Sequence, residues 1–250
     1  MKQALLAVSF GTSVSRAGES IDAVENALRK QAPHLPFYRA FTSPTIRRIL
    51  AARGQAVPGL EEALERMRSD GASHVILQPT HLLYGYEYDK LKATAEVCAQ
   101  GFEKFQTGSP LLAGTQDLLE LARVLDAVYP AVPEQEYVFL GHGTEHFANM
   151  VYPALETVLH TLGRVDCFVT TVEGWPDYET TAEKMRTMRA HLVPLMLVAG
   201  EHALNDMAGE HSSLKAVLEA QGKAVECTMT GLGLLAGVQE MYCRHLRQML

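Results

Sequence analysis

Short apolar runs alternate with amphipathic segments along the chain, and this alternation limits the fold more than any other sequence feature. Apolar runs of four to eight residues are typical of buried strands, whereas apolar residues spaced three and four apart predict helices. The predicted strands span residues 4–9, 35–41, 74–79, 104–112, 137–141, 165–171, 192–199 and 223–229. The predicted helices lie near residues 19–32, 59–70, 87–101, 115–128, 147–162, 178–190, 204–221 and 233–249. Strands and helices in this order form parallel sheets covered by helices on both faces, so we predict an α/β fold.

The pattern divides into two similar halves. The first strand of each half ends in a similar turn, FGTS at residues 10–13 and GHGT at residues 141–144. Two prolines interrupt the helical pattern in the segment YPAVPE at residues 129–134, which predicts a short linker. We therefore predict two similar lobes, residues 1–129 and 130–250, each a four-stranded parallel sheet flanked by helices. A ligand of such sheets lies beyond the carboxyl ends of the strands, so the active-site cleft is expected between the lobes.

Composition narrows the classes of partner. The net charge of −7 argues against nucleic acid or an anionic membrane surface, because both require a basic patch. No apolar run approaches the length of about 18 residues that a membrane helix needs. The four cysteines are scattered and form no CxxC pair. We therefore expect a globular cytoplasmic protein, and a homo-oligomer only from the general prevalence of symmetric assemblies.

Three turns of the second half each place a residue able to bind metal at the end of a predicted strand. These residues are His142 in GHGT, Glu173 in VEGWP and His202 in VAGEHALND. Two imidazoles and a carboxylate are a common ligand set for a divalent first-row ion, and three protein ligands leave positions open for a substrate. Each residue taken alone is more often an ordinary loop residue, and the metal interpretation rests on finding three of them at neighbouring strand ends.

Longer motifs around these residues resemble those of the anaerobic cobalt chelatases of cobalamin synthesis, the CbiK type. The matching segments are SFGTS at 9–13, FTSPTIRRIL at 41–50, THLLYGYEYDKL at 80–91, GHGTEHFAN at 141–149, VEGWP at 172–176 and VAGEHALNDMAGE at 198–210. The resemblance implies the two-lobed class II chelatase fold and a lyase that inserts Co²⁺ into sirohydrochlorin and releases two protons. It also implies that His142, Glu173 and His202 bind the metal, which is a substrate, and that no organic cofactor is needed.

The reaction needs proton acceptors as well as a metal holder. A neutral imidazole can serve as both, so we assign His142 to metal binding and to accepting a pyrrole proton. Glu87 is the second candidate acceptor, although a glutamate in the first turn of a helix is also favoured by the helix dipole. We expect His81 to be a structural, hydrogen-bonded histidine. His146 is expected to support the metal site or to line the cleft.

The tetrapyrrole substrate carries carboxylates, which an acidic chain must hold with local donors. We expect the first turn to line the cleft through Ser9, Phe10, Gly11, Thr12, Ser13 and Arg16. A helix N-terminus after this turn would also attract anions. Arg47 and Arg48 are further candidates, with solvated surface arginines as the alternative. Tyr84 and Gly85 are expected at the cleft wall, and Trp175 either stacks on the macrocycle or anchors its loop.

Two other functions stay open at this stage. One is insertion of Fe²⁺, as in sirohaem formation, because a His, His and Glu set does not separate Co²⁺ from Fe²⁺ or Ni²⁺. The other is a non-catalytic carrier of haem or metal, which would need no proton acceptor. A nucleotide-binding protein is discounted, because neither GxxxxGK[ST] nor GxGxxG follows a predicted strand.

Overall fold

The computed structural model describes residues 2–250, which form two compact α/β units. Unit 1 combines the residues up to Ala113 with Val238–Leu250, and unit 2 comprises Gly114–Gly237. This division differs from the predicted lobes 1–129 and 130–250. Helix α5 (Thr115–Val128) packs against α6 (Val151–Thr161) in unit 2, and most of α9 (Ala236–Arg247) belongs to unit 1. Helix α5 was thus predicted in the first lobe but lies in unit 2, and α9 was predicted in the second lobe but lies mostly in unit 1.

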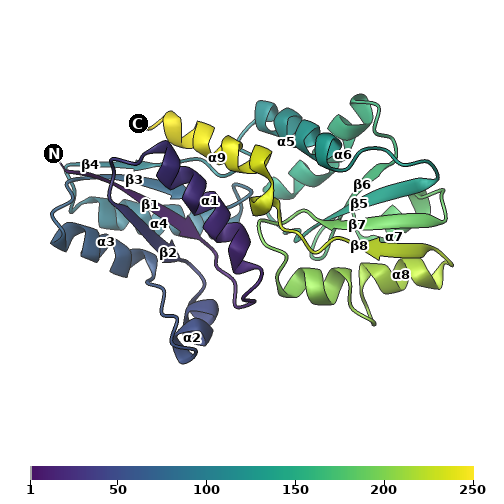
Figure 1. The fold of residues 1–250 in the computed structure, drawn as a ribbon, viewed down its shortest axis with the longest axis horizontal. Coiled ribbons are helices and arrows are strands. Elements are labelled where there is room, and N and C mark those ends of the chain that lie inside the picture. Colours follow the sequence, from purple (N-terminus) through teal and green to yellow (C-terminus); the bar gives the residue numbers. More distant parts are fainter. Residues whose placement is uncertain (1) are drawn as a thin grey trace. The chain divides into compact units, whose positions relative to one another are not determined.

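The sheet of unit 1 has four parallel strands in the order β2-β1-β3-β4. The strands are β1 (Gln3–Ser9), β2 (Phe37–Phe41), β3 (His74–Pro79) and β4 (Lys104–Thr107). The helices connecting them are α1 (Gly18–Gln31), α2 (Pro44–Ala52), α3 (Leu60–Ser69) and α4 (Tyr86–Ala99). Figure 1 shows α1 and α9 over one face of this sheet, whereas α3 and α4 pack on the other. The central strand β1 is buried on both faces, which explains its continuous apolar sequence.

Unit 2 repeats the same topology, with strand order β6-β5-β7-β8. Its strands are β5 (Gln135–Gly141), β6 (Cys167–Thr171), β7 (Arg189–Pro194) and β8 (Ala224–Cys227). Besides α5 and α6 it contains η1 (Phe147–Met150), α7 (Tyr178–Lys184), the single π-helical turn η2 (Ala203–Met207), α8 (Leu214–Ala220) and η3 (Leu232–Leu234). One core of this unit joins Val138 and Leu140 of β5 to Ala203 and Met207 of η2. The turn η2 is thus fixed to the sheet by buried side chains.

The predicted fold class is confirmed, since both units are four-stranded parallel sheets flanked by helices. Several elements differ from the prediction. The strand predicted over 104–112 ends at Thr107, and the strand predicted over 192–199 spans Arg189–Pro194. Helix α2 was not predicted, although Ser43 caps it by accepting from the Ile46 N–H and Pro44 follows at its first position. The helix predicted to reach residue 190 ends at Lys184. The helix predicted over 204–221 is interrupted before Ser213, whose side chain caps α8.

Across residues 2–250, no helix has both the length and the apolar composition needed to cross a lipid bilayer.

Candidate metal and substrate site

His142 and Glu173 follow neighbouring strands of unit 2 and are held together by the backbone. Strand β5 pairs in parallel with β6, and the pairing continues past the ends of both strands. The Val172 N–H donates to the Gly141 carbonyl at 3.1 Å, and the Glu173 N–H donates to the His142 carbonyl at 2.8 Å. The sheet register therefore fixes the spacing between these two predicted ligands.

Gly143 allows the two loops to lie this close. Its φ is +81°, a left-handed conformation that residues with a Cβ rarely adopt. A Cβ at this position would lie 2.8 Å from the backbone nitrogen of Gly174 and 2.9 Å from the carbonyl carbon of Glu173. Glycine is therefore required at position 143 both by the backbone conformation and by the neighbouring loop.

His202 reaches the same place from the segment after β7. It is the N-cap of η2, and its imidazole meets that of His142 edge to face, with ring centroids 4.5 Å apart. His142 Nδ1 lies 3.9 Å from Glu173 Oε2. The three side chains are 43%, 65% and 43% exposed for His142, Glu173 and His202, so an ion from solvent can reach them. Within residues 2–250, however, no group of three His, Cys, Asp or Glu side chains is already arranged to hold a metal ion.

Hydrogen bonds at Nδ1 leave the Nε2 atoms of both histidines available. His142 Nδ1 lies 2.9 Å from the Gly143 carbonyl oxygen, and His202 Nδ1 lies 2.7 Å from Asp206 Oδ2. A carbonyl or carboxylate oxygen accepts a hydrogen bond, so in the neutral form of each ring the hydrogen is on Nδ1 and Nε2 keeps its lone pair. Asp206 was not predicted as part of the site, although its position four residues after His202 on a helical segment was a usable signal.

The loop after β6 presents Trp175 and is anchored through its backbone. The Trp175 side chain is 51% exposed, while its carbonyl accepts from Asn149 Nδ2 at 2.6 Å. The same asparagine accepts from the Thr144 N–H through Oδ1 at 3.1 Å. Lys184 Nζ lies 5.9 Å from the centroid of the Trp175 ring. The loop is thus anchored without using the indole, and the ring remains exposed.

The segment after Thr144 carries His146 and Phe147, which follow the predicted ligand His142 closely in sequence. His146 caps η1, because its Nδ1 accepts from the Ala148 N–H at 3.0 Å. The local role of His146 is therefore to begin a helix. Phe147 is 85% exposed, which is unusual for a phenylalanine, and the sequence analysis did not identify it.

In unit 1 the first turn only partly fits its predicted role. Ser9 is 1% exposed and its Oγ accepts from Thr80 Oγ1 at 2.7 Å, which corrects the expectation that Ser9 lines a cleft. Gly11 is also buried, with a φ of +99°, and a Cβ at this position would lie 2.7 Å from the Phe41 ring. By contrast, Phe10 is 46% exposed. Thr12 is half-buried and its Oγ1 accepts from the Val14 N–H at 3.2 Å.

The other donors predicted around this turn differ in their availability. Ser13 is half-buried, and its carbonyl accepts from Arg53, whereas Arg16 and Arg48 are exposed. Helix α1 begins at Gly18, after Arg16, and no side chain caps it. Arg47 is already paired, because its Nη2 lies 2.8 Å from Glu62 Oε2.

The loop after β3 places Tyr84, Gly85 and Glu87 at the start of α4. Gly85 is the N-cap of this helix. Tyr84 is 39% exposed, donates to Ser109 Oγ at 3.1 Å and meets the Tyr88 ring at an edge, with centroids 4.9 Å apart. Glu87 lies in the first turn and is paired with Lys90 at 2.6 Å. These contacts are also compatible with the alternative role for Glu87, in which it only stabilises the N-terminus of α4 through the helix dipole.

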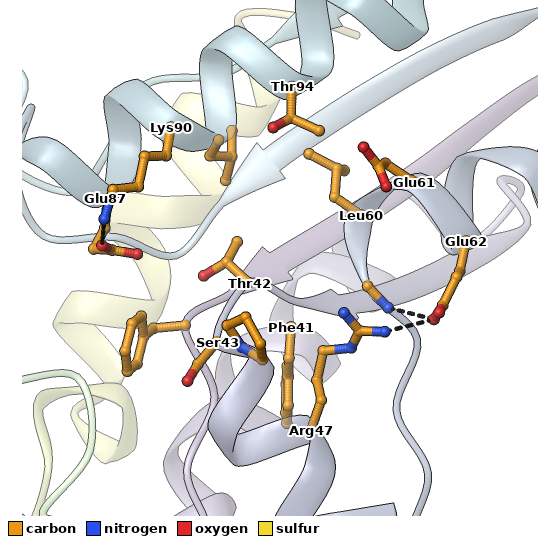
Figure 2. A pocket seen from close by; sticks show the side chains of 14 residues that line it. Phe41, Thr42, Ser43, Arg47, Leu60, Glu61, Glu62, Glu87, Lys90 and Thr94 are labelled. Carbon is orange, nitrogen blue, oxygen red and sulfur yellow. Dashed lines mark hydrogen bonds and ion pairs between the residues drawn. The ribbon is translucent and has the colours of Figure 1, made fainter.

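Glu87 also lines a cavity of about 510 Å³ within unit 1. Figure 2 shows this cavity with Glu87 and Lys90 on one side and Arg47 on another, where Arg47 points to Glu62. Phe10 lines it as well. Arg47 and Lys90 are each paired with a carboxylate, so neither contributes an unpaired positive charge to the cavity.

His81, just beyond β3, differs from the hydrogen-bonded histidine that we expected. Both of its ring nitrogens are buried, and neither has a hydrogen-bond partner within residues 2–250. Burial lowers the pKa of His81 to about 4, and the nearby Glu87 carboxylate opposes that shift only in part. The imidazole is therefore neutral at physiological pH.

The arrangement of two parallel sheets with loops at their carboxyl ends is the chelatase-like fold. SirB from Bacillus subtilis with Fe³⁺ is similar over 99% of this chain and 95% of its own, with a TM-score of 0.67 and 16% identity. CbiX, described as the terminal enzyme for biosynthesis of siroheme in denitrifying bacteria, is similar over 99% of both chains, with a TM-score of 0.62 and 16% identity. These likenesses establish the fold.

Sequence comparison establishes the family. The model of the family described as cobalt chelatase (CbiK) matches residues 3–250. Sirohydrochlorin cobaltochelatase of Salmonella typhimurium is 35% identical over 100% of this chain and 97% of its own length. Sirohydrochlorin cobaltochelatase CbiKC of Nitratidesulfovibrio vulgaris is 33% identical over 98% and 89%. The chain belongs to the CbiK cobalt chelatase family.

Proposed function

We propose that this protein is a sirohydrochlorin cobaltochelatase, a lyase of tetrapyrrole metabolism that serves cobalamin biosynthesis. The observation that carries the proposal is family membership over residues 3–250, together with two curated relatives that bear this name and align over nearly their full lengths. The reaction joins Co²⁺ to the four nitrogens of sirohydrochlorin and releases the two pyrrole protons.

We assign the incoming Co²⁺ to His142, Glu173 and His202. The support is their proximity, because His142 lies 3.9 Å from the Glu173 carboxylate and 4.5 Å, centroid to centroid, from the His202 ring. Two neutral imidazoles and one carboxylate suit a divalent first-row ion and leave coordination positions for the pyrrole nitrogens. All three side chains are partly exposed, so they have space to rotate toward an incoming ion.

His142 has a second role in this proposal, as acceptor of a pyrrole proton. Its Nε2 carries a lone pair, because Nδ1–H donates to the Gly143 carbonyl. A neutral imidazole with a free ring nitrogen can act as a general base. Glu87 is the proposed acceptor of the other proton. Loss of the first proton, to Glu87, begins to draw the cation from the protein to the ring. His142 Nε2 is released as the cation leaves it, and it then accepts the second proton.

The proposed contacts to sirohydrochlorin are with Phe10, Thr12, Ser13, Tyr84, Gly85 and Trp175. The exposed rings of Phe10, Tyr84 and Trp175 offer flat apolar surface to a flat ligand. Cytoplasmic action is also proposed, because the free thiols of Cys98, Cys167, Cys227 and Cys243 suit a reducing compartment. Assembly into a homo-oligomer stays a prediction, which light scattering would test.

The function is tested by anaerobic absorbance of the purified protein with sirohydrochlorin and Co²⁺, beside the variant His142→Ala. We expect the native protein to produce the metallated spectrum and the variant to be slower by about 10²-fold or more, the usual loss for a general base. Full activity of the variant would remove the proposed base while leaving the chelatase intact. Binding of the pigment without turnover above the spontaneous rate would favour a carrier. Parallel reactions with Fe²⁺ and Ni²⁺ rank the metals.

A further inference from the structure

Asp206 forms a side-chain hydrogen bond with the His202 imidazole. Its Oδ2 lies 2.7 Å from His202 Nδ1, and the side chains of His202 and Asp206 are 43% and 35% exposed. Residues four apart on a helical segment share one face, so the carboxylate lies beside the ring. A carboxylate only accepts hydrogen bonds, and it therefore retains the hydrogen of His202 on Nδ1.

The turn that carries Asp206 is held from several sides. Ala203 and Met207 are fully buried on the sheet side of η2. The Asp206 backbone carbonyl accepts from the Tyr178 hydroxyl at 3.1 Å, and the Ala208 N–H donates to the Ala203 carbonyl at 3.2 Å. Burial, followed by the charge of Asp206, raises the pKa of Tyr178 to about 12, so its phenol stays a donor. A π-helical turn of this kind occurs frequently at functional sites.

We infer that Asp206 is a positioning residue for the metal ligand His202: it fixes the Nδ1–H tautomer and ring orientation, so that Nε2 is presented to the incoming ion. This inference rests on the proposed metal role of His202 and deepens it. Metal-binding histidines generally donate their other ring N–H to such a partner, which raises the basicity of the binding nitrogen. Two different acceptors thus hold the hydrogen on Nδ1: the Gly143 carbonyl for His142 and the Asp206 carboxylate for His202.

A neighbouring carboxylate provides a matched control. Glu201 adjoins His202 in sequence, but its Oε2 accepts from Asn205 Nδ2 at 3.2 Å. Changing either acid to its amide removes one negative charge from the same turn and preserves side-chain size. Only Asp206→Asn removes the acceptor that enforces the tautomer, because an amide can also donate to Nδ1.

The experiment measures the dissociation constant of Co²⁺ alone for the purified protein and for D206N, E201Q and H202A. We expect D206N to bind Co²⁺ about 10- to 100-fold more weakly, which is typical for loss of a residue that supports a metal ligand. In the chelation assay, D206N should lower kcat while the KM for sirohydrochlorin stays near the native value. E201Q should match the native protein in both measurements.

Nitrogen NMR of the His202 ring separates positioning from a merely structural effect. We expect hydrogen on Nδ1 in the native protein and in E201Q, and a substantial Nε2–H population in D206N. Native Co²⁺ affinity in D206N, or a His202 ring still hydrogenated only at Nδ1, would overturn the inference. Native Co²⁺ affinity in H202A would instead overturn the proposed metal site. Thermal unfolding of each variant checks that it is folded, and D206A, which has no amide to rearrange, repeats the affinity test.

Discussion

The imidazole rings of His142 and His202 lie edge to face with centroids 4.5 Å apart, although they belong to loops after different strands. If both rings bind one ion, their contributions to Co²⁺ affinity are not independent. We expect H142A and H202A each to weaken binding by at least about 10-fold, and the double variant to be little weaker than the poorer single one. Calorimetric titration of all three variants measures this. Losses that simply multiply would indicate two separate contacts.

Gly143 provides a test of how the loops shape the site. Gly143→Ala places a Cβ 2.8 Å from the Gly174 backbone nitrogen in a left-handed conformation. We expect the free energy of unfolding to fall by about 1–3 kcal/mol and chelation to be largely lost. Gly163→Ala is the control, because Gly163 has a φ of +89° with nothing near its Cβ position. It should lose about 1 kcal/mol and keep its activity, as urea unfolding and rate measurements can show.

Substitutions at Ser9 and Ser13 distinguish a structural hydroxyl group from a proposed substrate-binding one. Ser9→Ala removes the buried hydrogen bond with Thr80, which typically lowers the free energy of unfolding by about 1 kcal/mol. The KM for sirohydrochlorin should not change. Ser13→Ala alters the half-buried part of the same turn and should raise KM with little effect on stability. A higher KM in the Ser9 variant would restore Ser9 to the substrate site.

His81 should make the protein sensitive to acid. Its pKa is about 4 in the folded protein and near 6.5 in the unfolded chain, so the unfolded chain binds more protons between these values. The contribution of His81 to stability is therefore complete above pH 6.5 and falls as the pH decreases toward 4, by up to about 3 kcal/mol. Urea unfolding at pH 7 and pH 4.5 should show a smaller acid loss for His81→Leu than for the native protein. His34→Leu, at an exposed position, should behave as the native protein does.

The role of Glu87 as a proton acceptor can be tested by comparing substitutions of Glu87 and of its ion-pair partner Lys90. Glu87→Gln removes the proposed proton acceptor, whereas Lys90→Met removes only its ion-pair partner, which is 72% exposed. We expect E87Q to lower kcat by about 10²-fold and K90M to keep a kcat near the native value. If Glu87 only stabilises the first turn of α4, E87Q will change the free energy of unfolding by less than about 1 kcal/mol and leave kcat unaltered.

Much of the architecture follows from local patterns, whereas the details of the site depend on contacts between distant residues. The apolar run at Gln3–Ser9 predicts a strand covered on both faces, because a strand that is buried on both faces has a continuous apolar sequence. The same pattern could not show that Ser9 bonds to Thr80, because the register of β1 against β3 decides that contact. Helix α2 did carry a local signal at Ser43 and Pro44. The unpartnered ring of His81 follows only from packing.

The position of α9 affects the order in which the chain can fold as it is synthesised. Tyr242 in this helix is fully buried and donates to the Thr80 carbonyl at 2.7 Å, and Arg247 Nη1 donates to Gln31 Oε1 at 2.9 Å. Unit 2 is therefore an insertion within unit 1. A ribosome completes Gly114–Gly237 before it reaches the last residues of unit 1. Unit 1 is therefore the first unit to begin synthesis and the last to be completed. One face of its sheet, β1 to β4, stays partly uncovered until α9 has been synthesised.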